Sequence, residues 1–160
     1  MIAPMQQPPE LEYVGFWLRV LAAVVDSLLV VVLTMPLMGL LYGRATDLGG
    51  TDFAAHPAGF LIEWVLPAVA VIVFWLARQA TPGKMLISAR IVDARTGTSP
   101  STGQAIVRYL GYYVSLLPLG LGLIWVGLDR RKQGWHDKIA GTVVVRPRRG
   151  AAEPVRFTSS

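Results

Sequence analysis

The sequence contains no cysteine and few charged side chains, and both shortages limit what the chain can do. Without cysteine the chain has no disulfide bonds and no thiolate chemistry. Charged residues make up 16% of the chain and hydrophobic residues 53%, with a mean hydropathy of +0.49. Between Arg19 and Arg78 the only lysine or arginine is Arg44. So short a chain has too little polar surface to cover such long apolar runs in water, which favours a bilayer.

Three apolar runs are candidates for membrane insertion. Helices are predicted over 16–42 and 59–77, and a third run of twenty uncharged residues covers 109–128. Uncharged runs of about 18 or more residues are typical of transmembrane helices. The N-terminus has no basic region of the kind that begins a signal peptide, and the first run is longer than a signal peptide's apolar segment. We therefore expect the first helix to be a retained span.

The polar stretches divide the chain into three expected parts: a polar tail over 1–12, a membrane domain over 13–146 and a disordered tail over 147–160. Within the domain, 43–58 is a Gly-rich loop and TPGK (81–84) predicts a type II turn. Ser101 and Gln104 fit a capping box that begins a helix. The segment 85–100 predicts a short strand and hairpin with Gly97 at positive φ, and AGTVVVRP (140–147) predicts a strand that pairs with it.

The distribution of basic residues predicts the topology. One lysine or arginine lies in 43–58, five lie in 78–108 and eight lie from 130 to the end. If the third run crossed fully, the two most basic blocks would face opposite sides, against the positive-inside rule. If the run enters and returns, both blocks are cytoplasmic, and the sequence LPLGLG (117–122) offers a bend halfway along it. We favour the re-entrant hairpin and keep a third full span as the alternative.

Two charges, Arg19 and Asp26, interrupt the first apolar run. Seven residues are close to two helical turns, so both side chains share one face but lie about 10 Å apart along the axis. Each therefore needs its own partner. Arg19 is near the helix entrance and could snorkel towards lipid headgroups. Asp26 lies deeper, and it is either a structural carboxyl bonded to a serine or threonine, such as Ser27 of a second copy or Ser115, or a group linked to ion or proton movement.

These motifs together resemble the RDD family of bacterial membrane proteins, which is named for an arginine and two aspartates. The resemblance rests on Arg19 and Asp26, on ATPGKMLISARIVDARTG after the second helix and on WHDKIAGTVVV near the end, and it extends over about 13–146. It implies that Arg19 and Asp26 are the first two name-giving residues and that Asp137 is the third, with Asp129 as the alternative. It also implies a location in the bacterial inner membrane and proposed, unidentified transport ligands.

The remaining candidate side chains do not form a recognisable catalytic or metal site. His136 and Asp137 are adjacent, but there is no cysteine, no HExxH spacing and no P-loop around TPGK. We therefore expect no enzyme activity, no cofactor and no metal. The net charge of +5 could indicate nucleic acid, but the basic residues flank apolar runs, which favours anionic lipid headgroups instead. In the re-entrant arrangement Arg19, Arg108, Asp129 and Asp137 all lie near the cytoplasmic interface, where we expect Arg19 to pair with Asp137.

The expected fold is mainly α: a polytopic membrane protein with two transmembrane helices, a third membrane-inserted segment and a small cytoplasmic β element. Two functions compete. One is a transporter or ion-coupled permease subunit that works through Asp26 on an unidentified ion or small ligand. The other is a non-catalytic membrane adaptor or assembly factor. Two or three helices are too few to enclose a path or to shield Asp26, so we expect a homo-oligomer or another membrane protein as partner, within the lipid bilayer.

Overall fold

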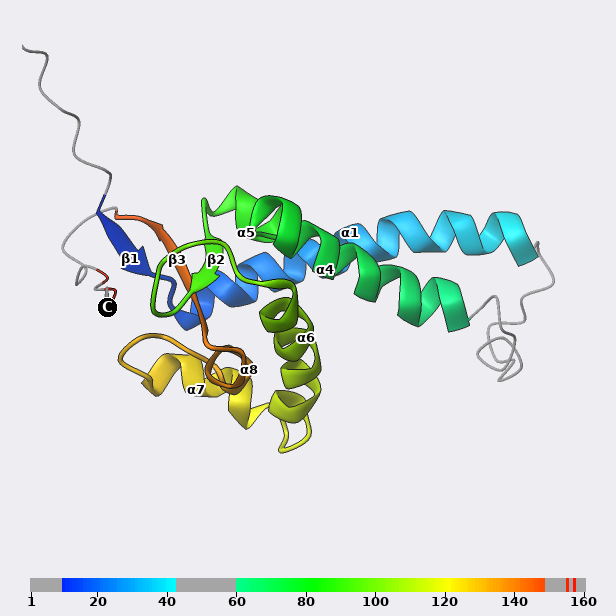
Figure 1. Cartoon of the computed structure of the whole chain (residues 1–160). Coiled ribbons are helices and arrows are strands. Elements are labelled where there is room, and N and C mark those ends of the chain that lie inside the picture. The colour runs from blue at the N-terminus through cyan, green and yellow to red at the C-terminus, as the bar shows by residue number, and fades with distance from the viewer. Residues whose placement is uncertain (1–9, 43–59, 149–154, 156, 158–160) are drawn as a thin grey trace, which may run out of the picture.

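The computed structural model describes residues 10–42, 60–148, 155 and 157. The loop expected over 43–58 and most of the two expected tails lie outside these residues. The described part of the chain is mainly helical, with one small sheet (Figure 1). Its elements, in chain order, are β1 (Leu11–Tyr13), α1 (Phe16–Tyr42), the π-helical turn η2 (Leu61–Val65), α4 (Leu66–Arg78), α5 (Pro82–Leu86), β2 (Arg90–Asp93), α6 (Thr102–Leu116), α7 (Leu121–Leu128), α8 (Trp135–Ala140) and β3 (Thr142–Pro147).

The two long helices form an extended arm. Figure 1 shows that α1 and α4 both extend from the sheet in the same direction. The bounds of α1 agree with the predicted helix over 16–42. The second predicted helix begins as the π-helical turn η2 and continues as α4, which ends where Gln79 adopts a left-handed conformation. Among the described residues, one helix is by itself long and apolar enough to cross a membrane, over Phe16–Pro36.

The third apolar run is broken where the sequence predicted a bend. Helix α6 begins with the predicted capping box of Ser101 and Gln104. It ends at Leu116, and α7 begins at Leu121, with the two axes bent by 100°. Leu119 and Gly120 have φ angles of 53° and 76°, which turn the backbone sharply between the two helices. By length and composition the pair is a candidate for a broken span or a re-entrant segment.

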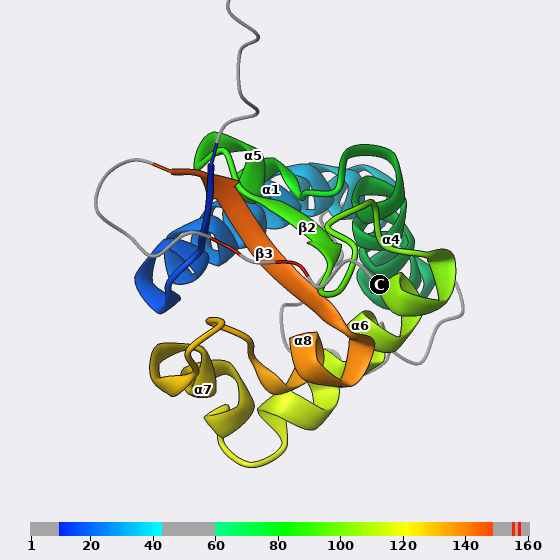
Figure 2. The same ribbon diagram turned by 60° about the vertical axis from the view of Figure 1, so that its left-hand side comes forward.

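The sheet has the strand order β1–β3–β2, and both pairings are antiparallel. The predicted pairing of 90–93 with 142–147 is therefore present, and Figure 2 shows β3 in the middle of the sheet. Two predictions were wrong in detail. Gly97 does take a positive φ, of 73°, but the described chain turns there without forming the second strand of a local hairpin. The expected polar tail over 1–12 also extends too far, because Leu11 and Glu12 belong to β1.

Apolar side chains on both faces of the sheet hold these elements together. On one face Ile91 and Val144 pack with Trp75 of α4 and Ala105 of α6, all at most 3% exposed. On the other face a second cluster contains Val92, Ala94, Val143 and Val145, with Val155 and Phe157 packed against it. Those last two residues come from the segment 147–160 that was expected to be disordered. The backbone N–H of Val155 donates to the carbonyl oxygen of Leu11, 2.9 Å away.

The TPGK segment is the first turn of a helix rather than the predicted type II turn. Pro82 is the first residue of α5, where its fixed φ suits a helix and its missing N–H costs nothing. Gly83 lies directly against α1: a Cβ atom at this position would stand 2.1 Å from the carbonyl oxygen of Ala22. Only glycine therefore allows α5 to approach the backbone of α1 this closely.

Candidate functional site

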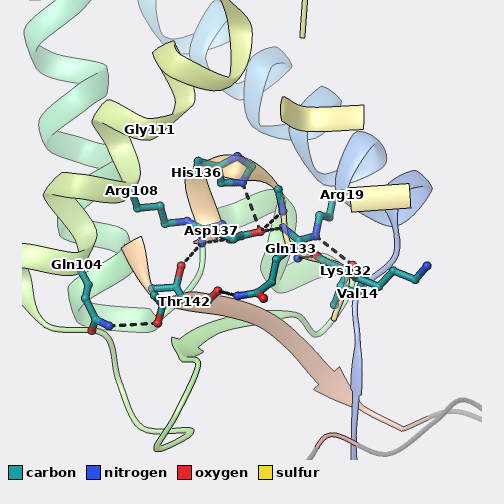
Figure 3. Close-up of polar contacts among 12 residues, drawn as sticks. Val14, Arg19, Gln104, Arg108, Gly111, Lys132, Gln133, His136, Asp137 and Thr142 are labelled. Atoms are coloured by element: carbon teal, nitrogen blue, oxygen red, sulfur yellow. Dashed lines mark hydrogen bonds and ion pairs between the residues drawn. The ribbon is translucent and has the colours of Figure 1, made fainter. Parts of the chain in front are cut away.

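The central polar cluster joins α1, α6 and α8 through one carboxylate (Figure 3). Asp137 is fully buried and forms ion pairs with Arg19, at 2.5 Å between Nη1 and Oδ2, and with Arg108 through Oδ1. The expected Arg19–Asp137 pair is thus present. Arg108, which is 1% exposed, is a second arginine on the same carboxylate. Three helices that are far apart in the sequence are therefore tied together by one charge.

Arg19 uses all of its guanidinium nitrogens inside the protein. Besides Asp137, it donates from Nε to the carbonyl oxygen of Val14 at 3.0 Å and from Nη2 to that of Lys132 at 2.5 Å. These three acceptors engage three of its five N–H donors inside the protein, so the side chain is held there rather than extended towards lipid headgroups. The arginine instead connects the start of α1 to the loop before α8.

Short-range packing brings Asp137 to this position. It is the third residue of α8, where its carboxylate also accepts the backbone N–H of Gly134 at 3.0 Å and so caps the helix. Helix α8 lies closely against α6 because Gly111 has no side chain: a Cβ atom there would be 2.9 Å from the Cα of His136. The close approach brings Asp137 within reach of Arg108, one turn earlier on α6.

The guanidinium of Arg108 is held on three sides. Its Nη1 donates to Thr142 Oγ1 at 2.6 Å, which links α6 to the first residue of β3. Its Cζ lies 5.3 Å from the ring centre of Trp75 and 5.8 Å from that of Tyr112. Aromatic rings attract a cation through their negative faces, and this attraction is larger where water is excluded. These contacts, with the Asp137 pair, offset part of the cost of burying the charge, although Nε and Nη2 are buried without a hydrogen-bond acceptor.

Electrostatics keeps Asp137 ionised and His136 neutral. Burial by itself raises the pKa of Asp137, but the positive charges of Arg108 and Arg19 outweigh it and hold that pKa well below its usual range. For His136, burial is the largest effect and lowers the pKa to about 3. The His136 ring stacks on Tyr112 with ring centres 4.0 Å apart, and its Nδ1 lies 3.3 Å from Ser115 Oγ. His136 is thus a packing residue of the cluster.

Asp26 occupies a second, separate polar contact deeper along α1. Its carboxylate accepts the hydroxyl of Thr81 at 2.5 Å and the backbone N–H of Gly83 at 2.7 Å. Lys84 Nζ lies 3.3 Å from Thr81 Oγ1 and brings a positive charge beside the pair. The sequence suggested a serine or threonine, such as Ser27 of a second copy or Ser115. A threonine does bond Asp26, but it comes from TPGK, and Ser115 contacts His136 instead. The contact with Ser27 of a second copy stays a prediction.

Asp129, the alternative third aspartate, does not join the cluster. It pairs with Lys138 at 2.5 Å and accepts the backbone N–H groups of Arg131 and Gln133 at 3.0 and 3.1 Å. These bonds shape the loop between α7 and α8, and hydrogen bonding and Lys138 lower the pKa of Asp129 against the opposing effect of burial. Asp137 is therefore the aspartate that Arg19 meets.

Sequence reasoning missed the groups that complete both contacts. Thr81 and Gly83 were assigned to a turn, and Trp75, Tyr112 and Thr142 were not considered as partners of Arg108. The available signal was the threonine-proline order in TPGK, because a threonine before a first-turn proline is a typical helix start. Among the described residues no group of three histidine or acidic side chains lies close enough to hold a metal ion.

The fold and the cluster define a class of protein whose helices expose apolar side chains and whose interior contains a network of arginine and aspartate. One or two of its helices are candidate membrane spans. The chain belongs to the RDD family, whose model matches residues 13–141. The matched range includes Arg19, Asp26 and Asp137, which the resemblance implied as the name-giving residues.

Two relatives are themselves without a described function. The chain is 37% identical over 75 residues to the uncharacterised protein RP437 of Rickettsia prowazekii, a match that covers 47% of this chain and 41% of that protein. It is 26% identical over 149 residues to the uncharacterised protein YxaI of Bacillus subtilis, covering 82% of this chain and 95% of that protein. The chain therefore spans less than half the length of the first relative. No solved structure matches the chain.

Proposed function

We propose that the protein is a multi-pass protein of the bacterial inner membrane, with α1 and the η2–α4 helix both crossing the bilayer. The observation that supports this is inverted burial. Arg108 and Asp137 are at most 1% exposed, whereas apolar side chains of the arm such as Leu33 and Val69 are 71% and 52% exposed. Contiguous apolar surfaces of this extent are rare on soluble monomers, whereas lipid covers them at no cost.

Within the membrane we propose a non-catalytic role, as an adaptor or assembly factor. The charged side chains that could carry chemistry are engaged in holding elements together. Arg19, Arg108 and Asp137 form one cluster, and Asp26 of α1 accepts a hydrogen bond from α5. Helix α1 meanwhile exposes Ala23 and Ser27, one turn apart, on a surface otherwise made of valine and leucine. Small residues four apart let two membrane helices approach closely, and a serine can add an interhelical hydrogen bond.

A subunit of a transporter is the second candidate, and the bonding of Asp26 supports it. Both carboxylate oxygens accept hydrogen bonds from the segment that connects α4 to the sheet. A proton on Asp26 would turn one carboxylate oxygen from a hydrogen-bond acceptor into a donor. The hydrogen bonds between α1 and that segment would then change. An ion-linked carrier requires this kind of coupling, in which binding of a proton changes the position of a chain segment, here the one between α4 and the sheet. This role needs a partner or further copies to enclose a path.

The adaptor role is tested on the exposed face of α1. Ala23→Leu adds bulk where we expect a partner helix, while Val32→Leu, at a position that is 64% exposed, adds bulk elsewhere on the same helix. Membranes that carry each variant are extracted in mild detergent and the mass of the native complex is measured. We expect a complex larger than one chain that is lost in the first variant and kept in the second. A monodisperse monomer in the unmodified protein would refute the role.

The two candidate functions are separated by Asp26→Asn. An asparagine can accept from the N–H of Gly83 and donate to the hydroxyl of Thr81, so the fold contact is kept while proton uptake is lost. The adaptor role predicts that the variant still forms the complex and supports its partner. Loss of proton-dependent flux in reconstituted vesicles, with the complex intact, would instead identify a transporter subunit.

A further inference from the structure

Helix α6 is amphipathic in the reverse sense to a helix of a soluble protein. Its buried residues are small or charged: Ala105, Arg108, Gly111 and Ser115. Its exposed apolar residues recur at helical spacing along the opposite face, and they are Ile106, Val107, Leu110, Tyr113, Val114 and Leu117. Together these side chains form an apolar platform that no element of the described chain covers.

Both ends of α6 are bonded to the same layer of the molecule. At its start, Gln104 Nε2 donates to Asp93 Oδ2 at 2.6 Å and to the carbonyl oxygen of Gly141 at 3.2 Å, both in or beside the sheet. Near its end, Ser115 Oγ accepts the backbone N–H of His136 at 3.1 Å, in the first turn of α8. The next residue, Asp137, pairs with Arg19 in the first turn of α1.

These contacts decide how α6 can lie relative to the arm. Arg19 marks the entrance of α1, so Ser115 is near that entrance and not at mid-membrane depth. A helix perpendicular to the membrane would carry Leu117 about 16 Å deeper than Ile106, at ~1.5 Å per residue. That displacement is about half of the ~30 Å hydrocarbon core, and the bond to His136 forbids it. Figure 1 agrees, since α6 runs across the direction of α1 and α4.

We propose that α6 lies flat in the cytoplasmic leaflet and that its apolar platform contacts the outer part of the acyl chains. This inference rests on the proposed membrane location of the arm, and it replaces both the re-entrant hairpin and the third full span. Helices of this kind place an apolar face a few ångströms below the headgroups. Arg130, exposed shortly after α7, matches the negative charge of anionic lipids at that level. Trp125, 40% exposed on α7, also suits the membrane boundary.

The test measures depth along α6. The chain has no native cysteine, so each variant carries a single thiol. Ile106→Cys, Leu110→Cys, Val114→Cys and Leu117→Cys are spin-labelled and reconstituted in vesicles of three parts phosphatidylethanolamine to one part phosphatidylglycerol. Collisions with oxygen and with a water-soluble nickel complex then report the depth of each label. Leu33→Cys on α1 is the control for the membrane location itself.

We expect four similar, shallow depths on α6 and a deep label at position 33. A steady increase in depth from position 106 to position 117 would overturn the flat placement and restore a hairpin or a span. Labels on α6 that are shielded from both oxygen and the nickel complex would mean that a second copy of the chain covers the platform, and this too would overturn it. If the label at position 33 were also accessible from water, the membrane location would be wrong, so the two failures are distinguishable.

Discussion

Removing one member of the buried ion cluster should destabilise the protein in a way that depends on the other members. Asp137→Ala leaves the guanidinium of Arg108, which is 1% exposed, without its ion pair. Breaking a buried pair on one side typically costs about 3–5 kcal/mol in the free energy of unfolding. Arg19→Ala leaves Asp137 paired with Arg108, and because Arg19 is 12% exposed we expect a smaller cost of about 2 kcal/mol.

The double variant measures whether Arg19 and Asp137 act on one another. Charged groups in contact commonly show an interaction energy of about 1–3 kcal/mol, so the double change should cost less than the sum of the single changes by at least about 1 kcal/mol. Unfolding in mixed detergent micelles is followed by tryptophan fluorescence, to which the buried Trp75 contributes. Lys138→Ala is the matched control: its pair with Asp129 is at the surface, with Lys138 43% exposed, and should change the stability by less than about 1 kcal/mol.

Strictly additive losses would refute the direct pair, and a loss for Lys138→Ala as large as that for Asp137→Ala would show that burial is not what decides the cost. Asp137→Asn adds a further check, since it preserves the volume of the side chain while removing the charge. We expect its cost to remain above that of Lys138→Ala, because two arginines then share no anion.

Three further predictions concern packing, pH and topology. Gly83→Ala should destabilise the fold by several kcal/mol or prevent it, because the new Cβ would stand 2.1 Å from a carbonyl oxygen, whereas Gly127→Ala, with open space around it, should be neutral in the same unfolding measurement. His136 is neutral in the folded state, with its pKa lowered from 6.5 to about 3. The unfolded state therefore binds the extra proton first, and stability should fall as the pH drops below 6.5, by about 2 kcal/mol at pH 5; a flat melting temperature between pH 6.5 and 5 would contradict this. Single cysteines at Thr46, Arg95 and Ala151, treated in intact cells with an impermeant maleimide, should react at position 46 alone, and reaction at position 151 would place the C-terminus outside.

How much of this fold could be predicted depended on whether the signal was local. The bounds of α1 follow from one continuous apolar run, and the bend between α6 and α7 follows from Pro118 and Gly120 within the third run. The capping box of Ser101 and Gln104 is equally local. Strand β1 carries no such signal, because three residues are too few to show an alternating pattern, and they become a strand only by pairing with β3.

The ion pair between Arg19 and Asp137 was predicted from the sequence, whereas the neutral groups that bond to the charged side chains were not. Arg19 and Asp137 each needed a partner in a poorly polar environment, so their pairing could be inferred across a sequence separation of 118 positions. Asp26 posed the same problem, but its partners are one hydroxyl and one backbone N–H, groups that occur throughout the sequence and carry no distinguishing pattern. The placement of α6 could not be inferred either, because a helix with one apolar face looks alike whether it crosses a membrane or lies along it.

The position of β3 has a consequence for the order in which the chain assembles during synthesis. The central strand of the sheet is the last one to be made, and Asp137 comes just before it. At ~5–20 residues per second, the ribosome needs roughly 6–24 s to travel the 118 residues from Arg19 to Asp137. On the proposed topology α1 and α4 are in the bilayer during this time, while Arg19, and later Arg108, have no anion to pair with. Synthesis of α8 and β3 is therefore the event that closes the sheet and the ion cluster. On the proposed topology, a chain stopped before Trp135 would have its helices in the membrane and its arginines unpaired.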